Sequence, residues 1–147
     1  MIPVRQTVFV ADHPKGWGNC QSAALASVFD LPLDQVPDTA SEEVRADHFW
    51  PPIYRWLADR GLKQISVPPG DERLKGVYSI GVGQSPRGAF KHAVVCKNGV
   101  MVFDPHPSDD GVTSFEYHDI FVPMTDGEKR LHAAGRWWAH KDRELED

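Results

Sequence analysis

The chain has 147 residues, a length that favours one domain with its own hydrophobic core over a tandem array or a two-domain enzyme. Its composition, 41% hydrophobic and 25% charged, is typical of globular proteins and excludes the disordered and collagen-like classes. Sixteen Lys and Arg against 21 Asp and Glu give a net charge of -5, so we expect no nucleic-acid partner. The two cysteines, Cys20 and Cys96, are too few for a disulfide framework and form no CxxC pair, which argues against a structural zinc site.

The sequence shows no targeting or membrane segment. The N-terminal stretch MIPVRQTVFVADHP is interrupted by polar residues and lacks the apolar core of a signal peptide. No apolar run approaches the roughly 18 residues that a membrane span requires. We therefore expect a cytoplasmic protein with no membrane partner, in a reducing compartment where a thiol stays free.

The first half of the chain predicts helices. After an extended segment over residues 3–10 and a turn-rich stretch, Asn19 is a suitable N-cap for a helix over QSAALASVF, which should end near Asp30 to Pro32. A second helical region is expected from Ser41. A longer helix should follow Pro51 and Pro52 through IYRWLADR, with Gly61 as its C-cap.

The second half predicts strands. The runs KQISVPP, GVYSIGVG, AFKHAVVCK and VMVFDPH are short, rich in β-branched and aromatic residues, and bounded by Gly, Pro or Asn; SFEYHDIFVPM offers a further strand. Asn98-Gly99 predicts a two-residue type I′ hairpin. Residues 128–147 should form a peripheral helix, with Trp137 and Trp138 packed on the body. The predicted fold is α+β, a single domain over residues 1–147 with a helical layer followed by an antiparallel sheet.

Cys20 is the candidate nucleophile, because the first turn of a helix favours a thiolate over a thiol. His92 on the strand AFKHAVV is the candidate base, and Asp104 on the partner strand is the candidate orienting acid. A regular hairpin register would set His92 opposite Pro105 and turn Asp104 to the other face. A bulge or bend near residues 103–105, or a strand that ends at Asp104, is required for the pair to meet.

An oxyanion intermediate needs hydrogen-bond donors. The backbone N–H of Cys20 is one candidate, and the side-chain amides of Gln6 and Asn19 compete to be the second. Cys96 lies in the apolar run AVVC, without an acid or base nearby in the sequence, and is predicted to be buried and inert.

This order of residues resembles that of papain-like cysteine hydrolases, especially compact bacterial and phage proteins of the C39-like and NlpC/P60-like groups. The similar stretches are QTVFV with GNCQSAALASVFDLPLDQVP, and SPRGAFKHAVVCKNGVMVFDPHPS, within about residues 2–110. The resemblance implies Cys20 as nucleophile, His92 as base and Asp104 as orienting acid. It also implies Gln6 as oxyanion donor, and a papain-like fold whose N-terminal catalytic helix packs on an antiparallel sheet.

The predicted function is therefore a cysteine-dependent hydrolase that cleaves an amide, peptide or isopeptide bond through a thioester, without a cofactor. Its expected partner is a peptide or amide-containing substrate, and acyl transfer by the same residues stays open. The candidate substrate-binding residues are Trp17, Asn19, Arg87 and His106.

Two alternatives use the same region. His92, Asp104 and His106 form a D-x-H pattern with a second imidazole, which would suit a metal-dependent hydrolase. A non-catalytic binding module on a degenerate hydrolase fold is the other alternative, and it predicts that Cys20 and His92 lie too far apart for a hydrogen bond.

Overall fold

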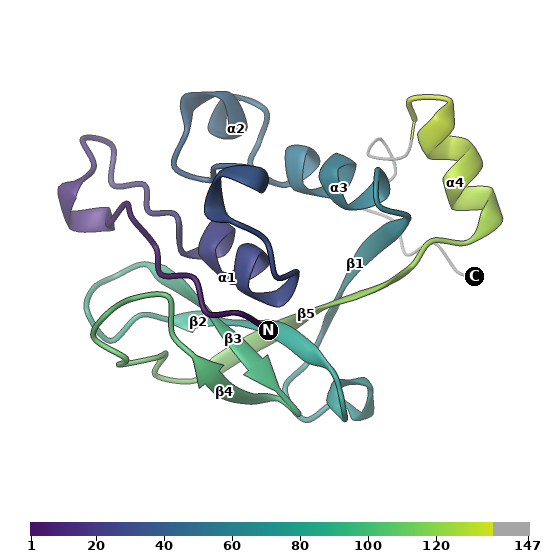
Figure 1. Ribbon diagram of the computed structural model, residues 1–147. Helices are drawn as coiled ribbons and strands as arrows, with labels where there is room; N and C mark the ends of the chain where they lie inside the picture. Colours follow the sequence, from purple (N-terminus) through teal and green to yellow (C-terminus); the bar gives the residue numbers. More distant parts are fainter. Residues whose placement is uncertain (137–147) are drawn as a thin grey trace.

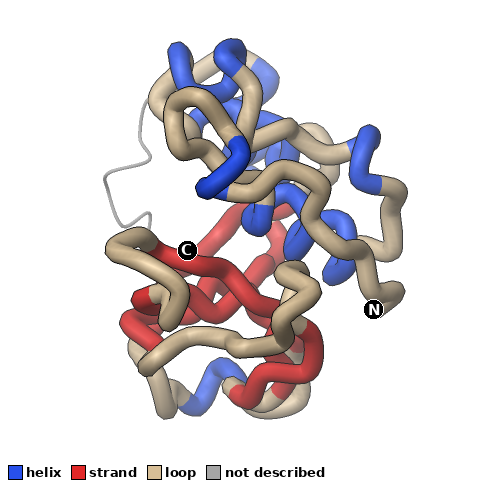
Figure 2. Tube along the Cα trace, turned by 90° about the vertical axis from the view of Figure 1, so that its left-hand side faces the viewer, coloured by secondary structure: helices blue, strands red, loops and turns tan. Residues whose placement is uncertain are grey.

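The computed structural model describes residues 1–136, which form an α+β fold with a helical layer on one side of an antiparallel sheet (Figures 1 and 2). The α-helices of this part of the chain are α1 (Cys20–Val28), α2 (Glu42–Ala46), α3 (Trp50–Ala58) and α4 (Asp126–Ala133). The strands are β1 (Leu62–Val67), β2 (Tyr78–Gln84), β3 (Lys91–Lys97), β4 (Val100–Phe103) and β5 (Phe115–Pro123), in the spatial order β1-β5-β2-β3-β4. The α+β prediction is thus confirmed at the level of class.

Helix α1 lies across the sheet and packs on β3 and β2. Every residue from Gln21 to Ser27 is buried, and the three alanines allow the helix to approach the strands closely. The main core lies in this interface, where Leu25 meets Ile80 and Val95. Asn19 occupies the N-cap position as predicted, but its side chain makes no capping hydrogen bond.

The next two helices differ in their bounds from those predicted. Helix α2 has five residues and begins after Ser41, whose hydroxyl accepts a hydrogen bond from the Val44 N–H at 3.2 Å. Helix α3 begins at Trp50, so the two prolines lie inside its first turn, where a missing N–H costs no hydrogen bond. The helix ends at Ala58, and its C-cap is Asp59 rather than Gly61.

The hairpin between β3 and β4 has the predicted turn, with φ of 55° at Asn98 and 75° at Gly99. Lys97 pairs with Val100 and Cys96 with Met101, but Val95 pairs with Phe103. One residue of β4, Val102, is therefore bulged out. The bulge moves the end of β4 by one position relative to β3, which supplies the register change that the sequence required for Asp104 to reach His92.

The C-terminal part of the described chain contributes to the centre of the sheet. β5 lies between β1 and β2 and pairs with both in antiparallel fashion. Helix α4 begins at Asp126 and ends at Ala133, which corrects the predicted helix over 128–147; Trp137 and Trp138 lie outside the described residues. None of the helices within residues 1–136 has the length and apolar character to cross a bilayer.

Candidate active site

Cys20 is the first residue of α1 and faces a cleft of ≈ 700 Å³. The walls come from three parts of the chain: the N-terminal segment (residues 1–18) with the start of α1, the region around α2, and the ends of β2, β3 and β5. Cys20 is half-buried, whereas Cys96 is fully buried on β3. Burial raises the pKa of the Cys96 thiol to about 12, because a low-dielectric environment disfavours the thiolate. The two cysteines therefore differ in accessibility and in their electrostatic environment.

His92, at the start of β3, is bound to Asp104. The imidazole Nε2 lies 2.6 Å from Asp104 Oδ1, and both side chains are almost fully buried. The backbone N–H groups of His106 and Gly111 donate to the two carboxylate oxygens of Asp104, at 2.9 and 2.8 Å. Burial alone would raise the pKa of this carboxyl, but these three hydrogen bonds outweigh it and lower the pKa below its ordinary value. Asp104 is thus an ionised acceptor, so Nε2 carries a proton.

The same imidazole interacts with Cys20. Burial lowers the pKa of His92, but the hydrogen bonds to Asp104 and Cys20 and their negative charges outweigh burial and raise the pKa to about 9. Because Nε2 is occupied by Asp104, Nδ1 is the nitrogen left for the Cys20 side. Cys20, His92 and Asp104 thus form one connected chain of side chains from two distant parts of the sequence.

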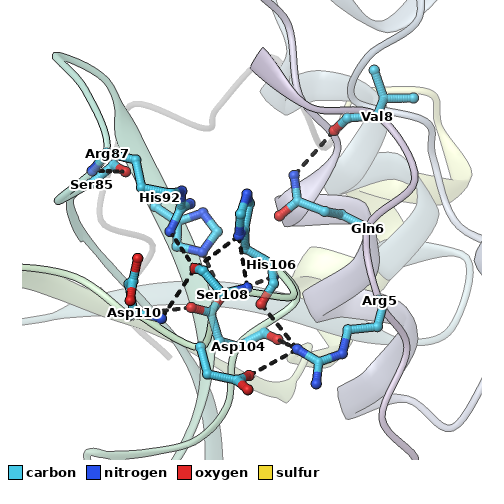
Figure 3. A network of polar contacts seen from close by, with 12 residues as sticks. Arg5, Gln6, Val8, Ser85, Arg87, His92, Asp104, His106, Ser108 and Asp110 are labelled. Atoms are coloured by element: carbon cyan, nitrogen blue, oxygen red, sulfur yellow. Dashed lines mark hydrogen bonds and ion pairs between the residues drawn. The ribbon is translucent and has the colours of Figure 1, made fainter. Parts of the chain in front are cut away.

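The N-terminal segment places Gln6 in the wall of the cleft (Figure 3). Its backbone N–H donates to the Pro105 carbonyl at 3.0 Å, next to Asp104, and its side-chain Nε2 donates to the Val8 carbonyl at 3.1 Å. Arg5 reinforces this junction, because its guanidinium donates to the carbonyls of Asp104 and His106 at 2.8 and 3.0 Å. An amide nitrogen has two protons, so Gln6 retains one donor for a ligand.

Two of the sequence-predicted site residues do not line the cleft. Asn19 is buried, its Oδ1 accepts from the N–H groups of Thr7 and Val8 at 3.0 and 2.9 Å, and it does not line the cleft. This side chain fixes the N-terminal segment against α1. Trp17 also lies outside the lining, where its ring stacks on His13 with centroids 5.2 Å apart.

Arg87 and His106 do line the cleft. Arg87 lies on the loop between β2 and β3 and donates from Nη1 to the Ser108 hydroxyl at 3.1 Å. His106 packs edge-on against Phe9, and its Nδ1 lies 2.9 Å from the Ser108 oxygen. Burial and the positive charge of Arg87 lower the pKa of His106, so this imidazole is neutral at pH 7.

Arg45 on α2 is a site residue that the sequence analysis did not find. It lines the cleft, and burial lowers the pKa of its guanidinium, an effect that the charge of Cys20 opposes only in part. Nothing local in SEEVRAD marks this arginine, because its place beside Cys20 depends on how α2 packs on the N-terminal segment. The guanidinium lies over the rings of Trp17 and Phe49, and these two aromatic residues were the only features of the sequence that could have indicated its position.

The residues of the metal alternative do not converge on one point. His92 Nε2 is directed at Asp104 and His106 Nδ1 at Ser108, with the two imidazole centroids 6.3 Å apart. Within residues 1–136, no group of three or more His, Cys, Asp or Glu side chains has an arrangement that would hold a metal ion.

Comparison with models of protein families, with curated proteins and with solved structures found no match to this chain. The chemistry of the site is therefore argued from its own geometry. A thiol at a helix start, an imidazole that interacts with it electrostatically and a carboxylate bound to that imidazole are the components of nucleophilic catalysis by cysteine.

Proposed function

We propose that the protein is a cysteine-dependent hydrolase that cleaves an amide, peptide or isopeptide bond through a thioester, with an arrangement like that of papain-like enzymes. The observation that carries this proposal is the position of His92, which interacts with the Cys20 thiol on one side and with the Asp104 carboxylate on the other. A structural histidine has no need of both partners. A non-catalytic module would not require the thiol and the imidazole to interact.

The proposed reaction uses one proton that His92 holds. The Cys20 thiolate attacks the carbonyl carbon, and a bond from sulfur to carbon forms while the carbonyl oxygen gains negative charge. When the C–N bond breaks, the His92 imidazolium gives its proton to the leaving nitrogen. The neutral imidazole then takes a proton from water, whose oxygen attacks the thioester; the acid leaves and the thiolate is restored.

The oxyanion needs donors where its charge develops. The Cys20 backbone N–H belongs to the first turn of α1, whose N–H groups have no partner within the helix. Gln6 offers the second donor from the facing wall, whereas the amide of Asn19 is engaged with Thr7 at 3.0 Å. Of the two amides that the sequence left open, the geometry favours Gln6.

The test is alkylation of the native protein by iodoacetamide at neutral pH, followed by intact mass and peptide mapping. We expect Cys20 to react at least about 10 times faster than Cys96, because Cys20 is accessible from the cleft whereas Cys96 is buried and its thiol pKa is raised to about 12. His92→Ala should slow Cys20, and Cys96→Ser is the matched control that should leave its rate unchanged. Equal rates at the two cysteines in the native protein would contradict the proposal.

A second measurement addresses turnover. p-Nitrophenyl acetate should release p-nitrophenol in a burst as Cys20 is acylated, and the acyl group should appear as added mass on the protein. Cys20→Ser should abolish the burst. A burst that persists in Cys20→Ser would show that another group is acylated.

A further inference from the structure

The cleft around Cys20 is lined by basic side chains and, among the described residues, by no carboxylate. Among the described residues that line the cleft, Arg45, Arg87 and Lys91 are cationic, and none is an aspartate or a glutamate. This contrasts with the chain as a whole, in which 21 acidic residues outnumber 16 basic ones. A concave site with low-dielectric walls concentrates the field of its charges, so the cleft should attract anionic groups.

Arg45 is held rigidly at one wall. Its guanidinium carbon lies 5.2 Å from the ring centroid of Trp17 and 4.9 Å from that of Phe49, and its Nε donates to the Thr39 carbonyl at 2.6 Å. Within residues 1–136 no carboxylate pairs with this guanidinium. A planar guanidinium that is fixed in this way has its outer N–H groups positioned to bind a carboxylate in bidentate fashion.

Arg87 lines the cleft from the sheet side, on the loop that joins β2 and β3. Its hydrogen-bond acceptor is the uncharged hydroxyl of Ser108, and no carboxylate in the described part of the chain pairs with it. Lys91 differs, because it forms an ion pair with Glu116. The cations of the cleft without a carboxylate partner among the described residues are therefore Arg45, from the helical layer, and Arg87, from the sheet side.

A third feature of the same walls favours a ligand rich in oxygen acceptors. Gln21 follows Cys20 in α1, lines the cleft and is 5% exposed. Its amide Nε2 is buried and has no hydrogen-bond partner among the described residues. A buried donor without an acceptor is costly, and a carboxylate or carbonyl oxygen of a bound peptide would satisfy it after a small rotation of the side chain.

We propose that the substrate of Cys20 is an acidic peptide, in which one carboxylate binds Arg45 and a second acidic group binds Arg87. This inference rests on the proposed cysteine hydrolase function and narrows its substrate class. A basic peptide would bring like charges against both arginines, and a neutral peptide would leave both without a counter-ion. The arginines thus select the acyl group that reaches the thiol.

The first experiment compares alkylation of Cys20 by iodoacetate and by iodoacetamide, which have similar shape and differ in charge. The rate constant for iodoacetate is divided by that for iodoacetamide, and this quotient is divided by the same quotient for N-acetylcysteine. The resulting ratio measures the attraction of an anion to the site. We expect this ratio to exceed one and to fall about fivefold in Arg45→Gln, the effect of a unit charge near a partly desolvated site. A smaller fall is expected in Arg87→Gln, and Arg45→Lys, which keeps the charge but loses the planar guanidinium, should retain only part of the preference.

Lys97→Gln is the matched control, because it removes a cation from the exposed far end of β3. Its ratio should equal that of the unaltered protein. If Arg45→Gln slows both reagents equally, Arg45 stabilises the thiolate and does not select substrates, and the acidic-peptide proposal is overturned. If Cys20 reacts no faster than Cys96 with iodoacetamide, the hydrolase function itself fails, so the two failures are distinguishable.

The second experiment uses peptide vinyl sulfones that differ only in glutamate against glutamine next to the electrophile. These side chains have nearly the same shape, so the comparison isolates charge. The glutamate compound should inactivate the protein faster, and Arg45→Gln should remove most of this advantage. Faster inactivation by the glutamine compound, or equal rates, would contradict the proposal even in a fully reactive protein.

Discussion

His92 lies between two groups that stabilise its charged form, the Asp104 carboxylate and Cys20. Its pKa of about 9 lies above the ordinary histidine value of 6.5. A group whose pKa is raised by folding stabilises the fold fully below its unfolded pKa, and this contribution is lost as the pH rises through the folded value. The site therefore contributes to stability at neutral pH and loses that contribution toward pH 9.

Asp104→Asn should remove much of this pH dependence. The amide cannot offer a negative charge to His92, so the imidazole pKa should fall, which an NMR titration of the ring protons would detect. The free energy of unfolding of the variant should lie about 1–3 kcal/mol below that of the unaltered protein at pH 6.5, because Asp104 supplies only part of the rise in the His92 pKa and Cys20 supplies the rest. This gap should narrow at about pH 9.5, where His92 is neutral in both proteins. A gap that stays constant with pH would mean that Asp104 acts only through packing.

Asp119 on β5 differs from Asp104, because at Asp119 the effect of burial on the carboxyl pKa outweighs that of hydrogen bonding. Its side chain is fully buried, Ser66 donates a hydrogen bond to Oδ1 at 2.5 Å, and Oδ2 has no partner among the described residues. Burial raises the pKa of this carboxyl to about 6, with the Ser66 hydrogen bond opposing it only in part. An acid whose pKa is raised by folding destabilises the fold once it is ionised, so stability is lost between about pH 4 and pH 6.

Asp119→Asn should therefore stabilise the protein by about 1–3 kcal/mol at pH 7.5, and the gain should vanish below about pH 4. Urea unfolding at the two pH values gives the difference. Asp34→Asn, at an exposed position, is the control and should change stability little at either pH. Destabilisation at pH 7.5 would show that the ionised carboxylate is satisfied in the fold.

At the scale of elements, β2 depends on glycine where it passes behind the site. Gly83 pairs with His92 across the β2–β3 ladder, and a Cβ at this position would lie 2.0 Å from the Ser114 carbonyl oxygen. The register between β2 and β5 also shifts between Val82 and Gly83. The glycine permits the close approach of two backbones that holds the start of β3 in place.

Gly83→Ala should destabilise the protein by about 3 kcal/mol, because the new methyl group would clash with the backbone carbonyl of Ser114, which cannot move away as the end of a flexible side chain could. The displaced ladder should also slow alkylation of Cys20, since His92 lies opposite the substitution. Gly127→Ala on α4 is the matched control: its Cβ meets nothing closer than 3.7 Å, and alanine favours a helix. In thermal unfolding, the midpoint temperature of Gly83→Ala should fall by several degrees, whereas that of Gly127→Ala should stay the same or rise.

The local signals in the sequence predicted the start of the first helix and the hairpin turn, whereas features that depend on tertiary packing were not predicted. The helix start at Cys20 and the Asn98-Gly99 turn depend on neighbouring residues, so both were predictable. A bulge or bend was predicted near residues 103–105, and the bulge lies at Val102, because several neighbouring positions satisfy the same hydrophobic pattern. Arg45 was missed, since only tertiary packing brings α2 to the cleft.

At the scale of the whole molecule, helix α4 is attached to the sheet by a buried ion pair. Lys63 Nζ on β1 lies 2.9 Å from Glu128 Oε1, and both side chains are less than a tenth exposed. Glu128 also accepts from the Thr125 N–H at 2.8 Å and completes the capping box at the start of α4. One carboxylate thus stabilises the helix and joins it to the edge strand.

Glu128→Ala should cost on the order of 3 kcal/mol of unfolding free energy, because it removes the carboxylate from a buried ammonium group. Alkylation of Cys20 in the folded state should keep its rate, since α4 does not line the cleft. Glu43→Ala, at an exposed position of α2, should have little effect on stability. A loss of Cys20 reactivity in Glu128→Ala under native conditions would show that α4 is coupled to the site.

The central position of β5 sets the order in which the protein can assemble. β1 is joined to the rest of the sheet only through β5, and Leu62 pairs with Pro123. The edge strand β1 can therefore pair only after a segment about 60 residues later in the chain has been synthesised. On the ribosome, the helix that carries Cys20 is synthesised early, but the sheet on which it packs closes only after β5 has emerged. Because Tyr117 of β5 also lines the cleft, the complete site forms only after the last strand of the sheet has been synthesised.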